Sequence, residues 1–143
     1  MKTVSQLLGP RRGLIISVSP YETVLHALQV MAERDVGALL VTEKGNTVGI
    51  ISERDYARKM ALKGKYSHET QVQEIMAHPV ICVSMHANVD EAMAIMSEHN
   101  IRHLPVVDDY KDVVGVVSMR DLVRETIAEQ TFVIRQLESY ITA

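Results

Sequence analysis

Cysteines, long apolar runs and a surplus of one charge are scarce or missing in this sequence, and each shortage excludes a class of protein. Cys82 is the only cysteine among 143 residues, so no disulfide can form within the chain. No apolar stretch approaches the roughly 18 residues of a membrane-spanning helix. Residues 1–5 lack the pattern of a signal peptide. We therefore expect a cytoplasmic protein.

The charge balance and composition point to an ordinary globular chain. The net charge of -3, from 15 basic and 18 acidic residues, argues against a general binder of nucleic acid or anionic membranes, although a local basic patch stays open. The length allows one domain, or two small repeats that share a core. Cys82 lies in the apolar run Val80–Val83, which predicts a buried and inert thiol.

An internal repeat organises the chain. The stretch Gly49–Asp55 (GIISERD) matches Gly115–Asp121 (GVVSMRD), and the copies lie 66 positions apart (118 minus 52). In each copy, a glycine and β-branched residues predict a buried strand, and a serine then predicts the start of a helix. An acid follows three residues after that serine, with an arginine immediately before the acid.

The order strand, helix, strand, strand, helix is predicted twice. The predicted strands are Leu14–Val18, Ala38–Val41, Val48–Ile51, Val80–Val83, Leu104–Val107 and Val113–Val117. The predicted organisation is a lead-in over 1–13, a first repeat over 14–64, a linker over 65–74, a second repeat over 75–125 and a C-terminal helix over 126–143. We expect an α/β (α+β) fold whose two β-α-β-β-α repeats pack sheet to sheet with pseudo-twofold symmetry, which would leave two equivalent clefts.

The serine and the acid at each helix start have two interpretations. Ser52 with Asp55, and Ser118 with Asp121, could simply cap their helices, at about 1 kcal/mol per cap. For one copy alone, capping explains the pattern as well as ligand binding does. The recurrence of strand, serine, arginine and acid in both copies favours a binding site.

The same atoms suit a nucleotide. A helix N-terminus and a serine hydroxyl can hold a phosphate, and an acid in the first turn can accept hydrogen bonds from the two hydroxyls of a ribose. Arg54 and Arg120 can add fork-shaped donors for phosphate oxygens. The neighbouring β-branched strand residues offer a flat apolar slot for a purine.

Over residues 14–125 the chain resembles a pair of cystathionine-β-synthase (CBS) domains, also called a Bateman module, of the stand-alone bacterial regulatory type. The resemblance lies in Ile101–Asp108 (IRHLPVVD) followed by Gly115–Asp121, and in the weaker first copy, Val36–Val41 (VGALLV) followed by Gly49–Asp55. Such pairs bind AMP, ADP, ATP, NAD or S-adenosylmethionine, or bind no ligand. No metal is expected, because His99 and His103, although four residues apart, lack nearby cysteine or acidic ligands.

The resemblance implies a role for each site residue. Asp55 and Asp121 would bind ribose, Ser52 and Ser118 would lie beside phosphate, and the adenine would lie against the first strand of the opposite repeat. The full predicted nucleotide site is Leu14, Ile15 and Ile16 near Ser118 and Asp121, Val80 and Ile81 near Ser52 and Asp55, with Arg54, Arg102, His103, Pro105 and Arg120. Gly37, Ala38 and Leu40 stand where the second repeat has Arg102, His103 and Pro105, so the Asp121 site is predicted to hold phosphate more strongly.

These inferences predict a regulatory, signal-transducing module, not an enzyme. It would sense energy or redox state by binding an adenine nucleotide such as AMP, ATP or NAD. We expect a homodimer that controls another protein, since the sequence contains no attached enzyme or channel. Two alternatives remain open: a structural or dimerisation module with vestigial nucleotide sites, and a nucleotide hydrolase, for which no nucleophile-base pair is evident.

Overall fold

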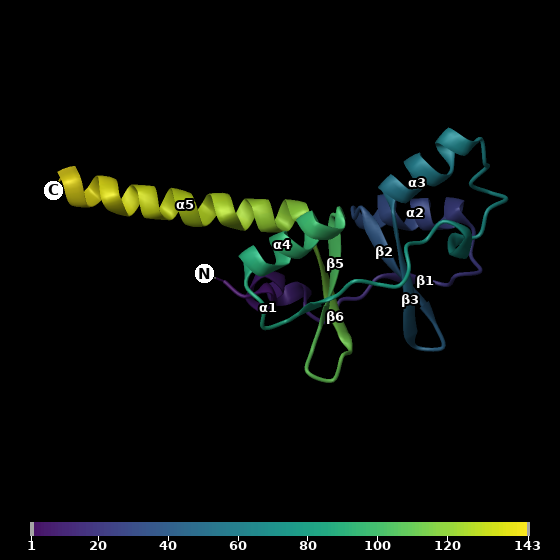
Figure 1. Cartoon of the computed structure of the whole chain (residues 1–143), viewed down its shortest axis with the longest axis horizontal. Coiled ribbons are helices and arrows are strands. Elements are labelled where there is room, and N and C mark those ends of the chain that lie inside the picture. Colours follow the sequence, from purple (N-terminus) through teal and green to yellow (C-terminus); the bar gives the residue numbers. More distant parts are fainter. Residues whose placement is uncertain (1, 143) are drawn as a thin grey trace. The chain divides into compact units, whose positions relative to one another are not determined.

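The computed structural model describes residues 2–142, which form two compact units (Figure 1). One unit is Ile15–Ile81, and the other combines the residues up to Leu14 with those from Cys82 onward. Each unit contains one three-stranded sheet and its helices. The predicted mixed α/β class and the C-terminal helix are therefore confirmed.

The unit Ile15–Ile81 has the sheet order β1-β2-β3. Strand β1 runs parallel to β2, and β2 runs antiparallel to β3. Its elements are β1 (Ser17–Val18), α2 (Val24–Arg34), β2 (Ala38–Glu43), β3 (Asn46–Ser52), α3 (Glu53–Lys59) and two 3-10 turns, Ala61–Lys63 and Val72–Glu74.

The other unit repeats this arrangement, with the sheet order β4-β5-β6. Its elements are α1 (Val4–Leu8), a 3-10 turn (Gly9–Arg11), β4 (Val83–Ser84), α4 (Val89–His99), β5 (His103–Val107), β6 (Val113–Ser118) and α5 (Met119–Thr142). The pairing register shifts after Val41 in β2 and after Val106 in β5, which are equivalent positions. The duplication thus extends to the irregularities of the two sheets.

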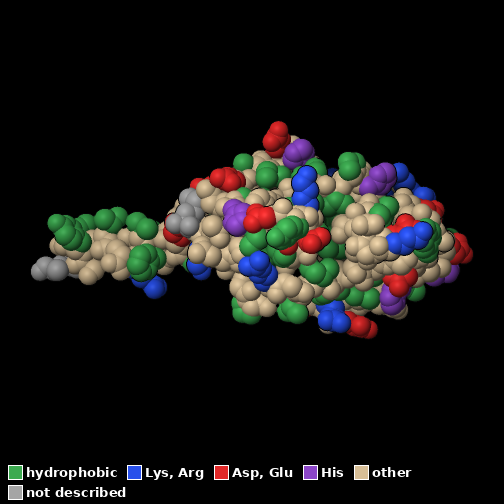
Figure 2. Space-filling view, turned by 90° about the horizontal axis from the view of Figure 1, so that it is seen from below, with side chains coloured by type: hydrophobic (Ala, Val, Ile, Leu, Met, Phe, Trp, Pro, Cys, Tyr) green, Lys and Arg blue, Asp and Glu red, His purple; other side chains and the backbone are tan. Residues whose placement is uncertain are grey.

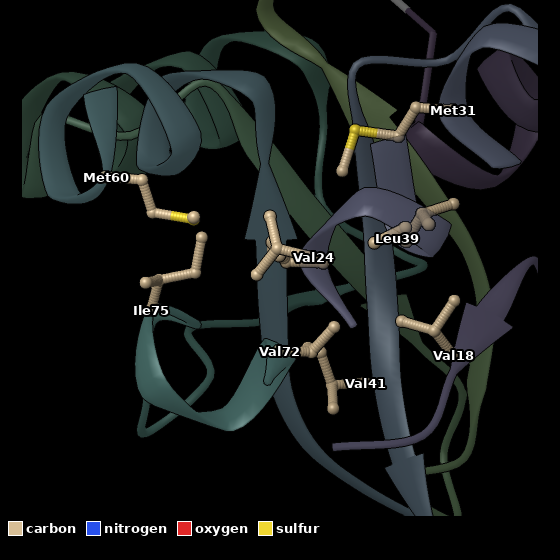
Figure 3. Packing of buried hydrophobic residues seen from close by; sticks show 10 residues of the cluster. Val18, Val24, Met31, Leu39, Val41, Met60, Val72 and Ile75 are labelled. Atoms are coloured by element: carbon tan, nitrogen blue, oxygen red, sulfur yellow. The ribbon is translucent and has the colours of Figure 1, made fainter. Parts of the chain in front are cut away.

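The core of the first unit lies between α2 and its sheet (Figure 3). Val24, Ala27 and Met31 recur at helical spacing and bury one face of α2 against Leu39 and Val41. Thr23 caps the start of this helix, and Asp35 ends it in the left-handed conformation. Asn88 and Asn100 do the same for α4.

The N-terminal segment completes the second unit. Leu8 is buried and lies over Gly115, where an added Cβ would come within 2.7 Å of Leu8 Cδ1. In the unit Ile15–Ile81, Met76 lies over Gly49 in the same way. A Cβ added to Gly49 would come within 2.5 Å of Met76 Sδ. Each glycine is needed for this close approach. The segment that precedes the first strand of one repeat therefore packs on the last strand of the other repeat.

Two predicted strands are much shorter than expected, which corrects the sequence analysis. Of Leu14–Val18 only Ser17 and Val18 pair with β2, and of Val80–Val83 only Val83 joins β4. The reason is topological, since one unit ends at Leu14 and the other at Ile81. The residues at each boundary connect the two units, and just before β1 only the carbonyl of Ile16 still accepts a hydrogen bond from β2, from the N–H of Leu40 at 3.3 Å.

Cys82 lies on such a connection and is exposed, so the prediction of a buried thiol is wrong. The partial burial of its sulfur still raises the pKa of the Cys82 thiol, which keeps it protonated at neutral pH.

Candidate functional site

The Asp121 site forms where β6 ends and α5 begins. The backbone N–H of Asp121 donates to Ser118 Oγ at 3.1 Å, and the N–H of Ser118 donates back to Asp121 Oδ2 at 2.9 Å. The N–H of Met119 donates to the carbonyl of Arg102 at 2.8 Å, which holds the start of β5 against the helix start. The carboxylate, the serine hydroxyl and the backbone of Arg102 are therefore held together.

The Asp55 site has the same local geometry at the start of α3. The N–H of Asp55 donates to Ser52 Oγ at 3.2 Å, and the Ser52 N–H donates to Asp55 Oδ2 at 3.0 Å. The N–H of Glu53 donates to the carbonyl of Gly37 at 3.1 Å. Capping is thus present at both sites. It does not exclude binding, because each carboxylate has lone pairs beyond those used by the cap.

The two carboxylates differ in their second oxygen. Asp55 Oδ1 lies 3.1 Å from Lys59 Nζ, which also donates to the carbonyl of Ile75 at 3.0 Å. Asp121 instead lies near Arg11, whose Nη1 is 3.5 Å from the already capped Oδ2. The Ser118 N–H and Arg11 thus both contact Oδ2 of Asp121, whereas Lys59 contacts Oδ1 of Asp55. The cationic partners therefore contact different oxygens of the two carboxylates.

Neither Lys59 nor Arg11 was predicted from the sequence as an ion-pair partner of these carboxylates. Lys59 follows Asp55 by four residues on a helix, a spacing that could have revealed the ion pair. Arg11 reaches Asp121 only because the N-terminal segment folds onto the second unit, and no local pattern in the sequence indicates this.

The register of the sheets places a histidine at one site only. His103 lies opposite Ser118 in the β5–β6 pairing, whereas its counterpart Ala38 lies opposite Ser52. Of the predicted basic residues, Arg102 and Arg120 are exposed, and Arg54 and His103 are half-buried. The two sites therefore differ in the residue opposite the capping serine, which is histidine at the Asp121 site and alanine at the Asp55 site.

The predicted apolar residues divide between the units. Leu14 belongs to the unit of Ser118 and Asp121, is 70% exposed, and follows Gly13, whose N–H donates to the carbonyl of Val114 at 2.7 Å. The residues of the other unit are Ile15, which is 38% exposed, the half-buried Val80 and Ile81, and Ile16, which packs on that unit's core. Pro105 is buried and pairs with Val116.

Within the described part of the chain, no cluster of three or more histidine, cysteine or acidic side chains is suited to a metal ion. The same residues include no helix with the length and apolarity needed to cross a membrane.

Comparison with known proteins gives consistent matches. The family model described as "CBS domain" matches residues 10–62 and 72–127. A solved protein with CBS domains from Burkholderia ambifaria MC40-6 is 42% identical, with a TM-score of 0.85 over 90% of this chain and 96% of that one. The CBS domain pair of protein MJ0100, solved with 5′-methylthioadenosine and S-adenosyl-L-methionine, is 28% identical, with a TM-score of 0.77 over 90% of this chain and 98% of that one.

A curated relative, the mitochondrial CBS domain-containing protein CBSX3 of Arabidopsis thaliana, is 38% identical over 125 residues, or 84% of this chain. The match spans 60% of that protein, and it spans 63% of a second relative, from Methanopyrus kandleri.

Proposed function

Because this chain belongs to the CBS-domain family and carries a pair of CBS repeats, which form a regulatory module, we propose that it binds an adenosine-containing ligand at the Asp121 helix start. The ligand would be of the AMP, ATP or NAD type. Its binding would bias the conformation of the module, and through it the activity of a regulated protein in the cytoplasm. A ligand can do so only to the extent that it prefers one conformation over the other.

The observation that carries this proposal is the fixed orientation of the Asp121 carboxylate at the helix start. Oδ2 is fixed by the Ser118 N–H, so the carboxylate is already oriented before a ligand arrives. Oδ1 can then accept hydrogen bonds from ribose hydroxyls without breaking the cap. Hydrogen bonds to an ionised carboxylate are about twice as strong as those between neutral groups.

Phosphate would lie on the basic side of the same site. The backbone of Arg102 bonds to the helix start, His103 pairs with Ser118, and Arg120 lies in the first turn, where the backbone N–H groups and the Ser118 hydroxyl also favour an anion. At the Asp55 site, Lys59 occupies the second carboxylate oxygen and the histidine is absent. We infer that the Asp121 site binds the nucleotide more tightly than the Asp55 site.

One relative supports the ligand class. The CBS domain pair of MJ0100 was solved with two adenosine derivatives, and neither carries a phosphate. The shared adenosine moiety is consistent with recognition through ribose. A phosphate preference in this chain would then come from its own Arg102 and His103.

The first experiment identifies the ligand. We expect mass spectrometry of small molecules released from the purified protein to find an adenosine compound. Titration of the emptied protein should raise its stability, by roughly 2.7 kcal/mol at a ligand concentration 100 times the dissociation constant. No thermal shift with AMP, ATP, NAD or S-adenosylmethionine would favour the alternative, a structural or dimerisation module with vestigial sites. Conversion of ATP or NAD into products would instead indicate an enzyme.

Removing the guanidinium of Arg102 should separate phosphate recognition from adenosine recognition. We expect Arg102→Ala to weaken AMP or ATP about tenfold while adenosine binds as before, because one charge-assisted contact is lost. Calorimetry with the two ligands measures this ratio. Arg34→Ala is the matched control, since it removes one positive charge from an exposed helix end in the other unit. Equal losses for adenosine and AMP would remove Arg102 from the phosphate site.

A further inference from the structure

The C-terminal part of helix α5 extends beyond the rest of its unit (Figure 1), and it carries exposed apolar side chains. Its first turns are packed: Leu122 is fully buried, and Thr126 Oγ1 lies 3.6 Å from Met93 Sδ of α4. Beyond them the helix continues to Thr142 with large apolar side chains exposed, as Figure 2 shows along its length. The exposed fractions are 57% for Ile127, 63% for Phe132, 49% for Val133, 54% for Ile134, 57% for Leu137, 86% for Tyr140 and 80% for Ile141.

Most of these side chains form one ladder along the helix. The ladder is Val123, Ile127, Gln130, Ile134, Leu137 and Ile141, with alternating steps of four and three residues. Such spacing places all six on one face and is the repeat of a two-helix coiled coil. Phe132 lies outside the ladder, toward the opposite face.

The steps read the same from either end of the ladder. A second α5 in the antiparallel direction would therefore place Val123 against Ile141, Ile127 against Leu137, and Gln130 against Ile134. A contact of this kind is self-complementary, as twofold symmetry requires. We propose that α5 pairs with α5 of a second copy of this chain in an antiparallel two-helix contact.

The charges beside the ladder select this direction. Arg124 and Glu138 flank the ladder on the same edge, and antiparallel pairing brings Arg124 of one copy to Glu138 of the other, twice. In parallel pairing these residues would lie roughly 20 Å apart along the axis. On the other edge, Val133 meets its own symmetry mate and widens the apolar contact.

The charged residues of α5 argue against a membrane surface as the partner that the apolar ladder binds. Interfacial helices carry mainly lysine and arginine there, which attract anionic lipids. Here Arg124 and Arg135 are outnumbered by Glu125, Glu129 and Glu138, and Glu125 already pairs with Lys2 at 3.4 Å. A surface of mixed sign beside an apolar ladder is the pattern of a protein contact.

Two charge substitutions at equally exposed apolar positions test the contact. Ile134→Glu places a charge in the ladder, and Phe132→Glu places the same charge outside it. We expect Ile134→Glu to weaken self-association more than about 100-fold, since symmetry introduces the charge twice. Phe132→Glu should match the unmodified chain. Sedimentation equilibrium of the full chain over a range of concentrations measures both.

Charge reversal tests whether the two α5 helices pair in the antiparallel direction. Arg124→Glu and Glu138→Arg should each weaken association, and the double variant should restore it, because the opposite charges meet again across the symmetric contact. A parallel pair or an unrelated partner would not show this rescue. Equal association for Ile134→Glu and Phe132→Glu would overturn the proposal, and so would a double variant that is weaker than either single one. Nucleotide-induced thermal shifts should be the same in all these variants, so this test is independent of the proposed ligand.

Discussion

Asp121→Ala is expected to remove most of the affinity for adenosine and its nucleotides while the protein stays folded. The change deletes the carboxylate that we propose binds both ribose hydroxyls. Hydrogen bonds to a charged group contribute about 1.5–3 kcal/mol each, so the loss of two should cost about 3–6 kcal/mol, or roughly 140-fold to 20,000-fold in the dissociation constant. Calorimetric titration with adenosine measures it directly, because adenosine has no phosphate to compensate.

The substitution also removes half of a helix cap, and this must be separated from the loss of binding. Asp121 accepts from the Ser118 N–H, and Asp55 accepts from the Ser52 N–H in the same geometry. Asp55→Ala should therefore cost a similar amount of stability, about 1 kcal/mol. Asp55→Ala should leave adenosine binding at the tighter Asp121 site unchanged. If the two variants bind adenosine equally well, Asp121 does not hold the ribose and the capping interpretation suffices.

The strands and helices that were predicted correctly are those indicated by a short, local sequence pattern. The strands that became β2, β3, β5 and β6 contain short apolar runs, and the helices after Ser52 and Ser118 start where the serine and acid recur. The comparison of copies also located the asymmetry between His103 and Ala38, which the sheet registers then placed beside the two serines. Duplication made these predictions possible, since each weak pattern was present twice.

The predictions that were wrong or missing concern features that depend on contacts between distant segments. An apolar run such as Leu14–Val18 has the composition of a strand, but its first residues join two units and have no strand to pair with. Periodicity cannot show where a chain leaves one core for another. The ion pair of Arg11 with Asp121 was missed for the same reason. The assignment of the site residues to ribose and phosphate stays a prediction, which the substitutions above test.

The second large effect is expected from Leu8→Ala, which should cost about 2–5 kcal/mol of the free energy of unfolding. Leu8 is 1% exposed and fills the space over Gly115, where no side chain can enter from β6. Its removal leaves a cavity that the rigid sheet cannot close. For a small protein with 5–15 kcal/mol in total, this is a large share. Denaturant unfolding followed by circular dichroism measures the loss.

Leu7→Ala provides the matched control, because Leu7 is the adjacent residue of the same short helix and is only half-buried. Its loss should be clearly smaller. The difference bears on function, since α1 leads directly into the turn that carries Arg11 to Asp121. If Leu8 anchors that turn, the variant should also change the salt dependence of adenosine binding, because a loosened Arg11 no longer competes for the carboxylate. A loss below about 1 kcal/mol for Leu8→Ala would mean that the N-terminal segment packs on the second unit only weakly, and that the Arg11 ion pair is not a fixed part of the site.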